Sequence, residues 1–162
     1  MTSCRAPKNT EEFEKYYQLR WQVLRKPWGQ PLGSEQDEFE KQSFHRMIVD
    51  EQQQVLAIGR LQRSGQYEGQ IRYMAVRKQF QGQGLGQQII KVLEQLAIEL
   101  GLKNITLNAR ENALGFYRKL AYQPQGDAYL LFGVIKHFSM GKVLTLSAKQ
   151  PFEQSVKHSL EQ

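Results

Sequence analysis

Three glycines stand at alternate positions, Gly82, Gly84 and Gly86, in the segment QFQGQGLGQQ. The stretch before it, IRYMAV, is typical of a strand, and the stretch after it, IIKVLEQLAIEL, has the apolar spacing of an amphipathic helix. Glycine costs conformational entropy in regular structure, so the cluster implies either a tight turn or a ligand that lies against the backbone. A tight turn would need one glycine rather than three. Because the first N–H groups of a helix are unpaired and attract anions, the segment predicts a phosphate-binding loop.

Two common phosphate-binding motifs do not fit this segment. A Walker loop ends in Gly-Lys-Ser/Thr, whereas Gly86 is followed by Gln87 and Gln88. In a dinucleotide-binding GxGxxG pattern that starts at Gly82, the third glycine position is occupied by Gln87. Such a fold also needs more parallel βαβ units than this chain length allows. The loop therefore belongs to another class of phosphate site.

The remaining pattern predicts a mixed sheet in an α/β fold. A helix begins at Thr10, and Ser34 caps a short acidic helix, SEQDEFEKQ. The later elements are three strands (FHRMIVD, VLAIGRLQRS, QIRYMAV), a helix over 84–100, a strand (NITLNA), a helix (ENALGFYRKLAY) and two strands joined near Phe132. This order indicates antiparallel pairs first and a parallel pair around the long helix. We expect one domain over 1–147, followed by a polar tail over 148–162.

Composition limits the compartment and the partners. No apolar run approaches the roughly 20 residues that cross a bilayer, and the start has no signal-peptide core. The single cysteine, Cys4, suits a reducing compartment. The net charge is +6, but Lys and Arg are scattered and alternate with acidic residues in EEFEK and SEQDEFEK, unlike the basic stripe of a nucleic-acid protein. We expect a cytoplasmic protein that binds neither nucleic acid nor membrane and whose basic surplus serves a phosphate-rich ligand.

Two motifs resemble signatures of one enzyme family. Gln81-x-x-Gly84-x-Gly86, which follows VRKQF, resembles the Q/RxxGxG/A acyl-CoA loop of the GCN5-related N-acetyltransferases (GNAT). ARENALGFYRKLAY resembles the second signature of that family, which ends in FYxxLGF, with Ala121 in place of its glycine. The resemblance implies a GNAT fold: a mixed sheet flanked by helices and splayed between the strand before the glycine loop and the next strand. It also implies transfer of an acetyl group from acetyl-CoA to an amine, with no metal.

The opening half, YYQLRWQVLRKPWGQPLGSEQDEFE, is similar to a proteobacterial GNAT subgroup. Some members of that subgroup are fused to a hot-dog thioesterase-like domain and are associated with fatty-acid synthesis. Two alternatives to amine acetylation therefore stay open: an acyltransferase-like domain that acts on a thioester or acyl carrier, and a CoA-binding module without turnover. The expected acceptor is a small-molecule or peptide amine, and a homodimer is left open.

The resemblance also implies a set of cofactor-binding residues. The pyrophosphate is expected on the backbone of Gln81, Gly82, Gln83, Gly84, Leu85, Gly86 and Gln87, and the pantetheine arm along the strand at Met74, Ala75 and Val76. Arg110 stands where many family members carry a cofactor-contacting asparagine, and the nearby Asn112 and Asn108 are alternatives for that role.

Acyl transfer to an amine needs three kinds of group. The acceptor ammonium must lose a proton before it attacks, the oxyanion needs a donor, and the CoA thiolate leaves more readily if it is protonated. By resemblance, the N–H of Met74 is the oxyanion donor and Tyr117 is the general acid. The base stays open among His45, His137, a water chain and three acidic residues of the predicted second helix, namely Glu35, Asp37 and Glu38.

Overall fold

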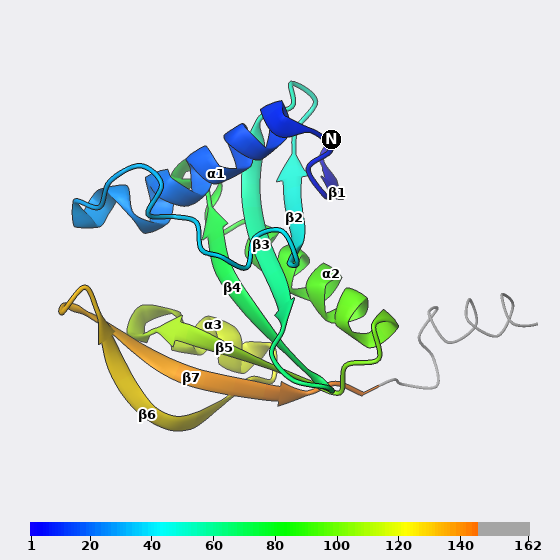
Figure 1. The fold of residues 1–162 in the computed structure, drawn as a ribbon, viewed down its shortest axis with the longest axis vertical. Helices are drawn as coiled ribbons and strands as arrows, with labels where there is room; N and C mark the ends of the chain where they lie inside the picture. The colour runs from blue at the N-terminus through cyan, green and yellow to red at the C-terminus, as the bar shows by residue number, and fades with distance from the viewer. Residues whose placement is uncertain (146–162) are drawn as a thin grey trace, which may run out of the picture.

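The computed structural model describes residues 1–145, which contain one seven-stranded mixed sheet (Figure 1). Its strands are β1 (Ser3–Arg5), β2 (Phe44–Val49), β3 (Val55–Arg63), β4 (Glu68–Val76), β5 (Asn104–Arg110), β6 (Gln123–Leu131) and β7 (Ile135–Val143). They lie in the order β1-β2-β3-β4-β5-β7-β6, and β4 and β5 form the parallel pair. The predicted mixed α/β sheet, with its antiparallel meander before a parallel crossover, is confirmed.

Three α-helices accompany the sheet in the described residues: α1 (Thr10–Leu24), α2 (Leu85–Glu99) and α3 (Leu114–Lys119). Single 3₁₀ turns cover Lys26–Trp28, Lys78–Phe80 and Glu111–Ala113. The side chain of Asn9 caps α1 by accepting a hydrogen bond from the N–H of Glu12 at 2.9 Å, and acidic residues in the first turn suit the helix dipole. The apolar face of α2 buries Ile89, Ile90, Leu93 and Ala97.

The helices pack on opposite faces of the sheet, so two apolar cores form. On one face α1 contributes Tyr16 and Leu19 to a cluster with Met47, Val49, Val55, Ile58 and Ala75. The larger cluster joins α2 and α3 to the other face and includes Leu61, Ile71, Ile105, Leu107, Tyr117, Tyr122 and Met140. Figure 1 shows α1 and α2 on either side of the upper strands. Because both faces are covered there, β3 reads as an almost continuous apolar run.

The parallel pair β4–β5 separates partway along its length. The two strands are paired from Glu68–Ile71 to Asn104–Leu107 only, although β4 continues to Val76 and β5 to Arg110. Figure 1 shows the two strands meeting at one end and diverging toward the other. The last residues of β4 therefore keep β3 as a partner on one edge, and no described strand pairs with their other edge. The predicted splay between these strands is confirmed.

A β-bulge distorts β4 where the strands separate. Ile58 pairs with Ala75 and Arg60 pairs with Arg72, so Tyr73 and Met74 together face a single residue, Gly59. Tyr73 takes the left-handed conformation, with φ of 58°, which is costly for a residue with a side chain. A Cβ at Gly59 would lie 2.6 Å from Ile89 and from the sulfur of Met74, so glycine is required opposite the bulge.

Three details of the sequence prediction need correction. The acidic segment 34–42 forms turns and no helix. Its acidic side chains bind the backbone of the segment itself. Asp37 accepts a hydrogen bond from the N–H of Phe39, and Glu40 accepts one from the N–H of Asp37, and these bonds compete with a helical backbone. The three-residue strand β1 was not predicted, and α3 is shorter than expected. The tail predicted over 148–162 lies outside the described residues.

Candidate active site

A cavity of about 830 Å³ lies where β4 and β5 separate. Its walls come from the end of α1, the end of β4, the glycine loop, the start of α3 and the β6–β7 hairpin. Nearly all the residues predicted for the site line it: Met74, Ala75, Val76, Gln81, Gly82, Gly84, Leu85, Gly86, Gln87, Arg110, Asn112 and Tyr117. Gln83 and His45 do not. The fold thus brings to one cavity most of the residues predicted for the site, which lie between positions 74 and 117.

The glycine loop presents the backbone of a helix N-terminus to this cavity. Gly82 and Gly84 have φ of 79° and 85°, a region that residues with side chains rarely adopt. Gly84 is the N-cap of α2, and no side chain of the described residues caps this helix. The first N–H groups of α2 are therefore available to an anion. Glycine is favoured at the third position, Gly86, for a different reason: a Cβ there would lie only 3.3 Å from the ring of Phe116 in α3.

Tyr117 lies on α3 with its ring against Phe116 and Tyr122, at centroid distances of 4.9 and 5.9 Å. Burial raises the pKa of its hydroxyl to about 12, against a smaller lowering by the charge of Arg110. The hydroxyl therefore keeps its proton over the physiological range. Within the described residues it makes no hydrogen bond, and the residue lines the cavity. A protonated hydroxyl without a partner at the cavity wall suits a proton donor.

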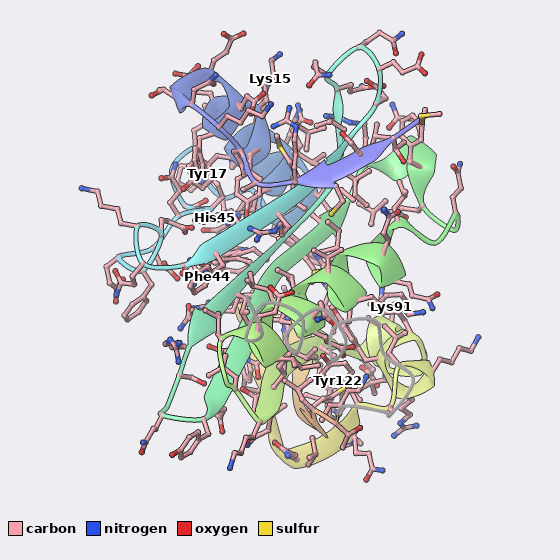
Figure 2. All side chains as sticks on the ribbon, turned by 90° about the vertical axis from the view of Figure 1, so that its right-hand side faces the viewer. Lys15, Tyr17, Phe44, His45, Lys91 and Tyr122 are labelled. Carbon is pink, nitrogen blue, oxygen red and sulfur yellow. The ribbon has the colours of Figure 1, made fainter. Side chains whose placement is uncertain are left out.

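The two histidine candidates lie in different places. His45 is buried under α1, and Figure 2 shows it beside Tyr17. Its Nε2 donates a hydrogen bond to the carbonyl of Glu40 at 2.8 Å, and its Nδ1 lies 2.9 Å from the Tyr16 hydroxyl. Burial lowers its pKa. Both ring nitrogens are engaged, and the structure does not bring this residue to the cavity. The role proposed for His45 from sequence therefore loses its geometric basis.

His137, by contrast, lines the cavity from β7. Its Nδ1 lies 3.1 Å from the carbonyl of Ile135, so Nδ1 carries the proton and Nε2 is the basic nitrogen. The ring stacks on Tyr129 at 5.2 Å with an interplanar angle of 15°. Burial lowers the pKa of His137, and the charges of Arg110 and Arg25 lower it further. His137 is therefore a neutral base at physiological pH.

The three acidic candidates for the base do not line the cavity. The N–H of Gly33 and the side-chain amide of Gln36 both donate to Glu35. Asp37 accepts from Arg60 at 2.7 Å, and this guanidinium and the N–H of Phe39 hold its pKa at about 2 despite burial. Glu38 is exposed. The structure therefore leaves His137 as the cavity-lining base among the predicted candidates.

Sequence reasoning missed the group of side chains that supports Tyr73. The guanidinium of Arg20 lies 4.1 Å from the centre of this ring, Arg60 lies 4.8 Å away and Arg72 lies 4.9 Å away. The Tyr73 hydroxyl donates to Asp37 at 3.3 Å. These contacts hold the residue in its left-handed conformation and so fix the bulge beside Met74. Arg20 and Arg60 come from α1 and β3, whereas Arg72 directly precedes Tyr73 on β4, and no local pattern in the sequence marks the three as a group.

The comparisons with known proteins agree with this geometry. The acetyltransferase (GNAT) family model matches residues 13–122. An uncharacterized N-acetyltransferase of Bacillus subtilis, YjcF, is 32% identical over 135 residues, which span 83% of this chain and 95% of the relative. The chain therefore belongs to the GNAT family of acetyltransferases, which use an acyl-CoA donor and an acceptor.

Solved structures support the fold. A putative N-acetyltransferase from Lactobacillus plantarum has a TM-score of 0.80 at 19% identity, over 89% of this chain and 99% of that one. An aminoglycoside 6'-N-acetyltransferase in complex with coenzyme A has a TM-score of 0.74 at 14% identity, over 92% and 99% of the two chains. These comparisons cover a single acetyltransferase domain and do not support the likeness to a thioesterase-fused subgroup.

Two further observations concern metals and membranes. Within residues 1–145 no group of three or more His, Cys, Asp or Glu side chains is arranged to hold a metal ion. None of the described helices is long and apolar enough to span a bilayer.

Proposed function

We propose that this protein transfers the acetyl group of acetyl-CoA to an amine by direct attack in the cavity between β4 and β5. The observation that carries the proposal is that two groups of backbone N–H and C=O atoms without hydrogen-bond partners in the described residues lie side by side. The uncapped N-terminus of α2, with its left-handed glycines, stands next to the unpaired edge of β4. One surface suits a pyrophosphate, and the other suits the amide-rich pantetheine arm.

The residues present fit this donor. The N–H groups from Gln81 to Gln87 would hold the pyrophosphate, and the Gln81 side chain already bonds the carbonyl of Val76 at 3.2 Å, which ties the loop to the strand. The backbone of Met74 to Val76 would pair with the pantetheine amides as an added strand does. The thioester would then lie near the bulge at Met74.

At the bulge, the N–H of Met74 would stabilise the oxyanion that forms when the amine nitrogen attacks the thioester carbonyl. The C–S bond then breaks and the sulfur leaves with the electron pair. Tyr117 would give its proton to this sulfur, since burial keeps the hydroxyl protonated. Solvent restores the phenol proton after release of the thiol.

His137 is the base we assign to the acceptor. Its Nε2 is unprotonated because Nδ1–H donates to Ile135. It takes the proton that the acceptor ammonium loses before attack, directly or through one water, and passes it to solvent. The second proton, which the nitrogen loses after attack, also goes to solvent. The nearby charges of Arg25 and Arg110, which lower the pKa of His137, would lower the pKa of a bound ammonium by the same repulsion.

Thiol release from acetyl-CoA tests the proposal, with a panel of primary amines against an acyl-carrier protein. We expect release that depends on an amine and an N-acetylated product by mass spectrometry. His137→Gln should lower kcat and remove the acidic limb of the pH–rate profile. Release that depends on the carrier alone, or tight binding of acetyl-CoA without release from any acceptor, would refute acetyl transfer to amines.

A further inference from the structure

The charged side chains that line the cavity are cationic. Among the described residues that line the cavity, three are arginines, namely Arg25, Arg72 and Arg110, and none is Asp or Glu. Arg25 ends α1, Arg72 lies on β4 and Arg110 ends β5, so three separate elements bring these charges together. Like charges repel, and such a wall needs an anion to balance it.

Arg25 is held in position by neutral groups. Its Nε donates to the carbonyl of Ser34 and its Nη1 to that of Leu24, each at 3.1 Å. Its guanidinium lies 5.6 Å from the centre of the Tyr73 ring and 5.3 Å from that of Phe132 at the β6–β7 turn. Within the described residues it has no carboxylate within ion-pair distance, and partial burial lowers its pKa. A half-buried guanidinium so placed gains most from a bound anion.

Arg110 lines the cavity from the end of β5, on the same face of the sheet as the proposed base. It pairs in register with His137 on β7, and His137 in turn pairs in register with Tyr129 on β6. Within the described residues the Arg110 side chain forms neither a hydrogen bond nor an ion pair, and burial lowers its pKa. Arg72 differs, because Asp37 accepts from it at 3.2 Å. Counting only partners in residues 1–145, Arg25 and Arg110 are therefore the two cavity arginines without a carboxylate partner.

We propose that the acceptor is a small amine that also carries a carboxylate, with the carboxylate bound by Arg25 and Arg110. The inference rests on the proposed function, because it names the substrate class of the same site. A carboxylate matches the planar fork of a guanidinium in two parallel hydrogen bonds. It also balances the charge that would repel a polycationic acceptor such as a polyamine. His137 lines the same cavity and is close enough to both arginines for their charges to lower its pKa, so a carboxylate bound there would bring the amine toward this base.

Matched pairs of amines test the carboxylate. Thiol release at saturating acetyl-CoA gives kcat/KM for lysine against cadaverine and for phenylalanine against phenethylamine, which differ only in the carboxylate. We expect the carboxylate-bearing member to be better by about 10- to 100-fold, as for loss of a charge-assisted hydrogen bond. Equal or reversed preference would overturn the inference. So would a lack of turnover with every carboxylate-bearing amine in a protein that binds acetyl-CoA.

The kcat/KM of phosphoethanolamine, compared with that of ethanolamine, tests whether the site prefers a phosphate to a carboxylate. A preference for the phosphate over all the carboxylates would overturn the choice of a carboxylate. Calorimetry with acetyl-CoA distinguishes failure of the proposed function from failure of the proposed substrate class. If acetyl-CoA does not bind, the proposed function fails and the inference fails with it. If acetyl-CoA binds and the amine preference is absent, only the inference fails.

Substitutions locate the effect on the two arginines. Arg25→Gln and Arg110→Gln should each lower kcat/KM for the carboxylate-bearing amine about 10- to 100-fold more than kcat/KM for its decarboxylated partner, with the extra loss in KM. Arg118→Gln on the exposed side of α3 is the matched control and should change neither value. Arg110 forms no side-chain hydrogen bond to other described residues, so its variant should fold normally. Equal losses for both amines would overturn the inference. So would weaker CoA binding by Arg110→Gln with the preference intact, which would make Arg110 the cofactor residue predicted from sequence.

Discussion

The arginines of this protein occupy two different environments. Between α1 and the sheet, Arg20 and Arg60 are fully buried and share one carboxylate, because Oε2 of Glu40 lies 2.9 Å from a nitrogen of each. We call Arg20, Arg60, Asp37 and Glu40 the buried ion network. In the cavity, Arg25 and Arg110 are half-buried and have no carboxylate partner in the described residues. Carboxylates of the protein therefore neutralise the arginines of the first region, whereas the charges of the cavity arginines are available to a ligand.

Tyr73 connects the two regions. Its ring lies 4.1 Å from the guanidinium of Arg20 in the buried ion network, and the residue also lines the cavity. The network thus acts on the cavity by holding the bulge of β4. It should govern stability and the shape of the site, whereas the cavity arginines should govern the choice of acceptor. The following predictions test this division of roles.

The largest effect is expected in the buried ion network. Glu40→Gln removes the shared negative charge and leaves two buried guanidiniums underbalanced. We expect the free energy of unfolding to fall by about 3–5 kcal/mol, as when one partner of a buried ion pair is removed. Urea denaturation measures this, with Glu38→Gln as a control because Glu38 is exposed on the same segment. If both variants have the stability of the wild type, the network does not hold the fold.

The next effect concerns the glycine loop. A valine at Gly84 would place a branched side chain where the pyrophosphate is expected, and loss of two charge-assisted hydrogen bonds lowers affinity about 10³-fold. Gly101→Val is the matched control. Gly101 follows the other end of α2, has φ of 80°, and like Gly84 has open space around its Cβ position. Both variants carry the same backbone strain, so only Gly84→Val should lose acetyl-CoA affinity in calorimetry. Equal affinities would remove the loop from the cofactor site.

Tyr117→Phe should give a smaller change that appears in turnover. The ring keeps its packing and the hydroxyl is removed, so kcat should fall by about 10²-fold with little change in acetyl-CoA affinity. The pKa of about 12 implies that Tyr117 contributes no alkaline limb to the pH–rate profile below that value. Wild-type turnover in the phenylalanine variant would show that Tyr117 only packs.

The smallest effect is expected at Ala121, which follows α3 and has φ of 72°. An L-residue in this conformation costs about 1–2 kcal/mol, partly offset by the entropy that glycine loses on folding. Ala121→Gly should therefore raise the free energy of unfolding by about 0.5–1 kcal/mol and leave kcat unchanged. Urea denaturation and thiol release measure both. A change in kcat would mean that the strain at Ala121 positions Tyr117.

Local patterns predicted the donor side of the site. The spacing of the glycines and the periodicity of the following helix lie within one short segment, so the loop, α2 and the strand before them could be placed from sequence. His137 and Arg110 were named singly from the sequence, but they could not be grouped with Arg25, because the three come from elements far apart in the chain. Only the register of β5 with β7 reveals that two of them are neighbours.

The wrong prediction of a helix over 34–42 has a similar origin. Its acidic residues match a solvent-exposed helix, but Asp37 and Glu40 are bound by Arg60 and Arg20 from other elements. Such tertiary ion pairs override local propensity and leave no trace in the spacing of residues. His45 was considered for the site because of its residue type. Its neighbours on α1, which make it structural, are about thirty positions away.

We expect the cavity to bind acetyl-CoA along the glycine loop and the open edge of β4. A crystal structure of the protein with bound CoA tests it most directly. We predict the pyrophosphate oxygens within hydrogen-bond distance of the N–H groups of 82–87, and the pantetheine amides bonded to the backbone of Met74 and Val76. CoA bound elsewhere on the protein, with this loop and strand edge free, would contradict the account.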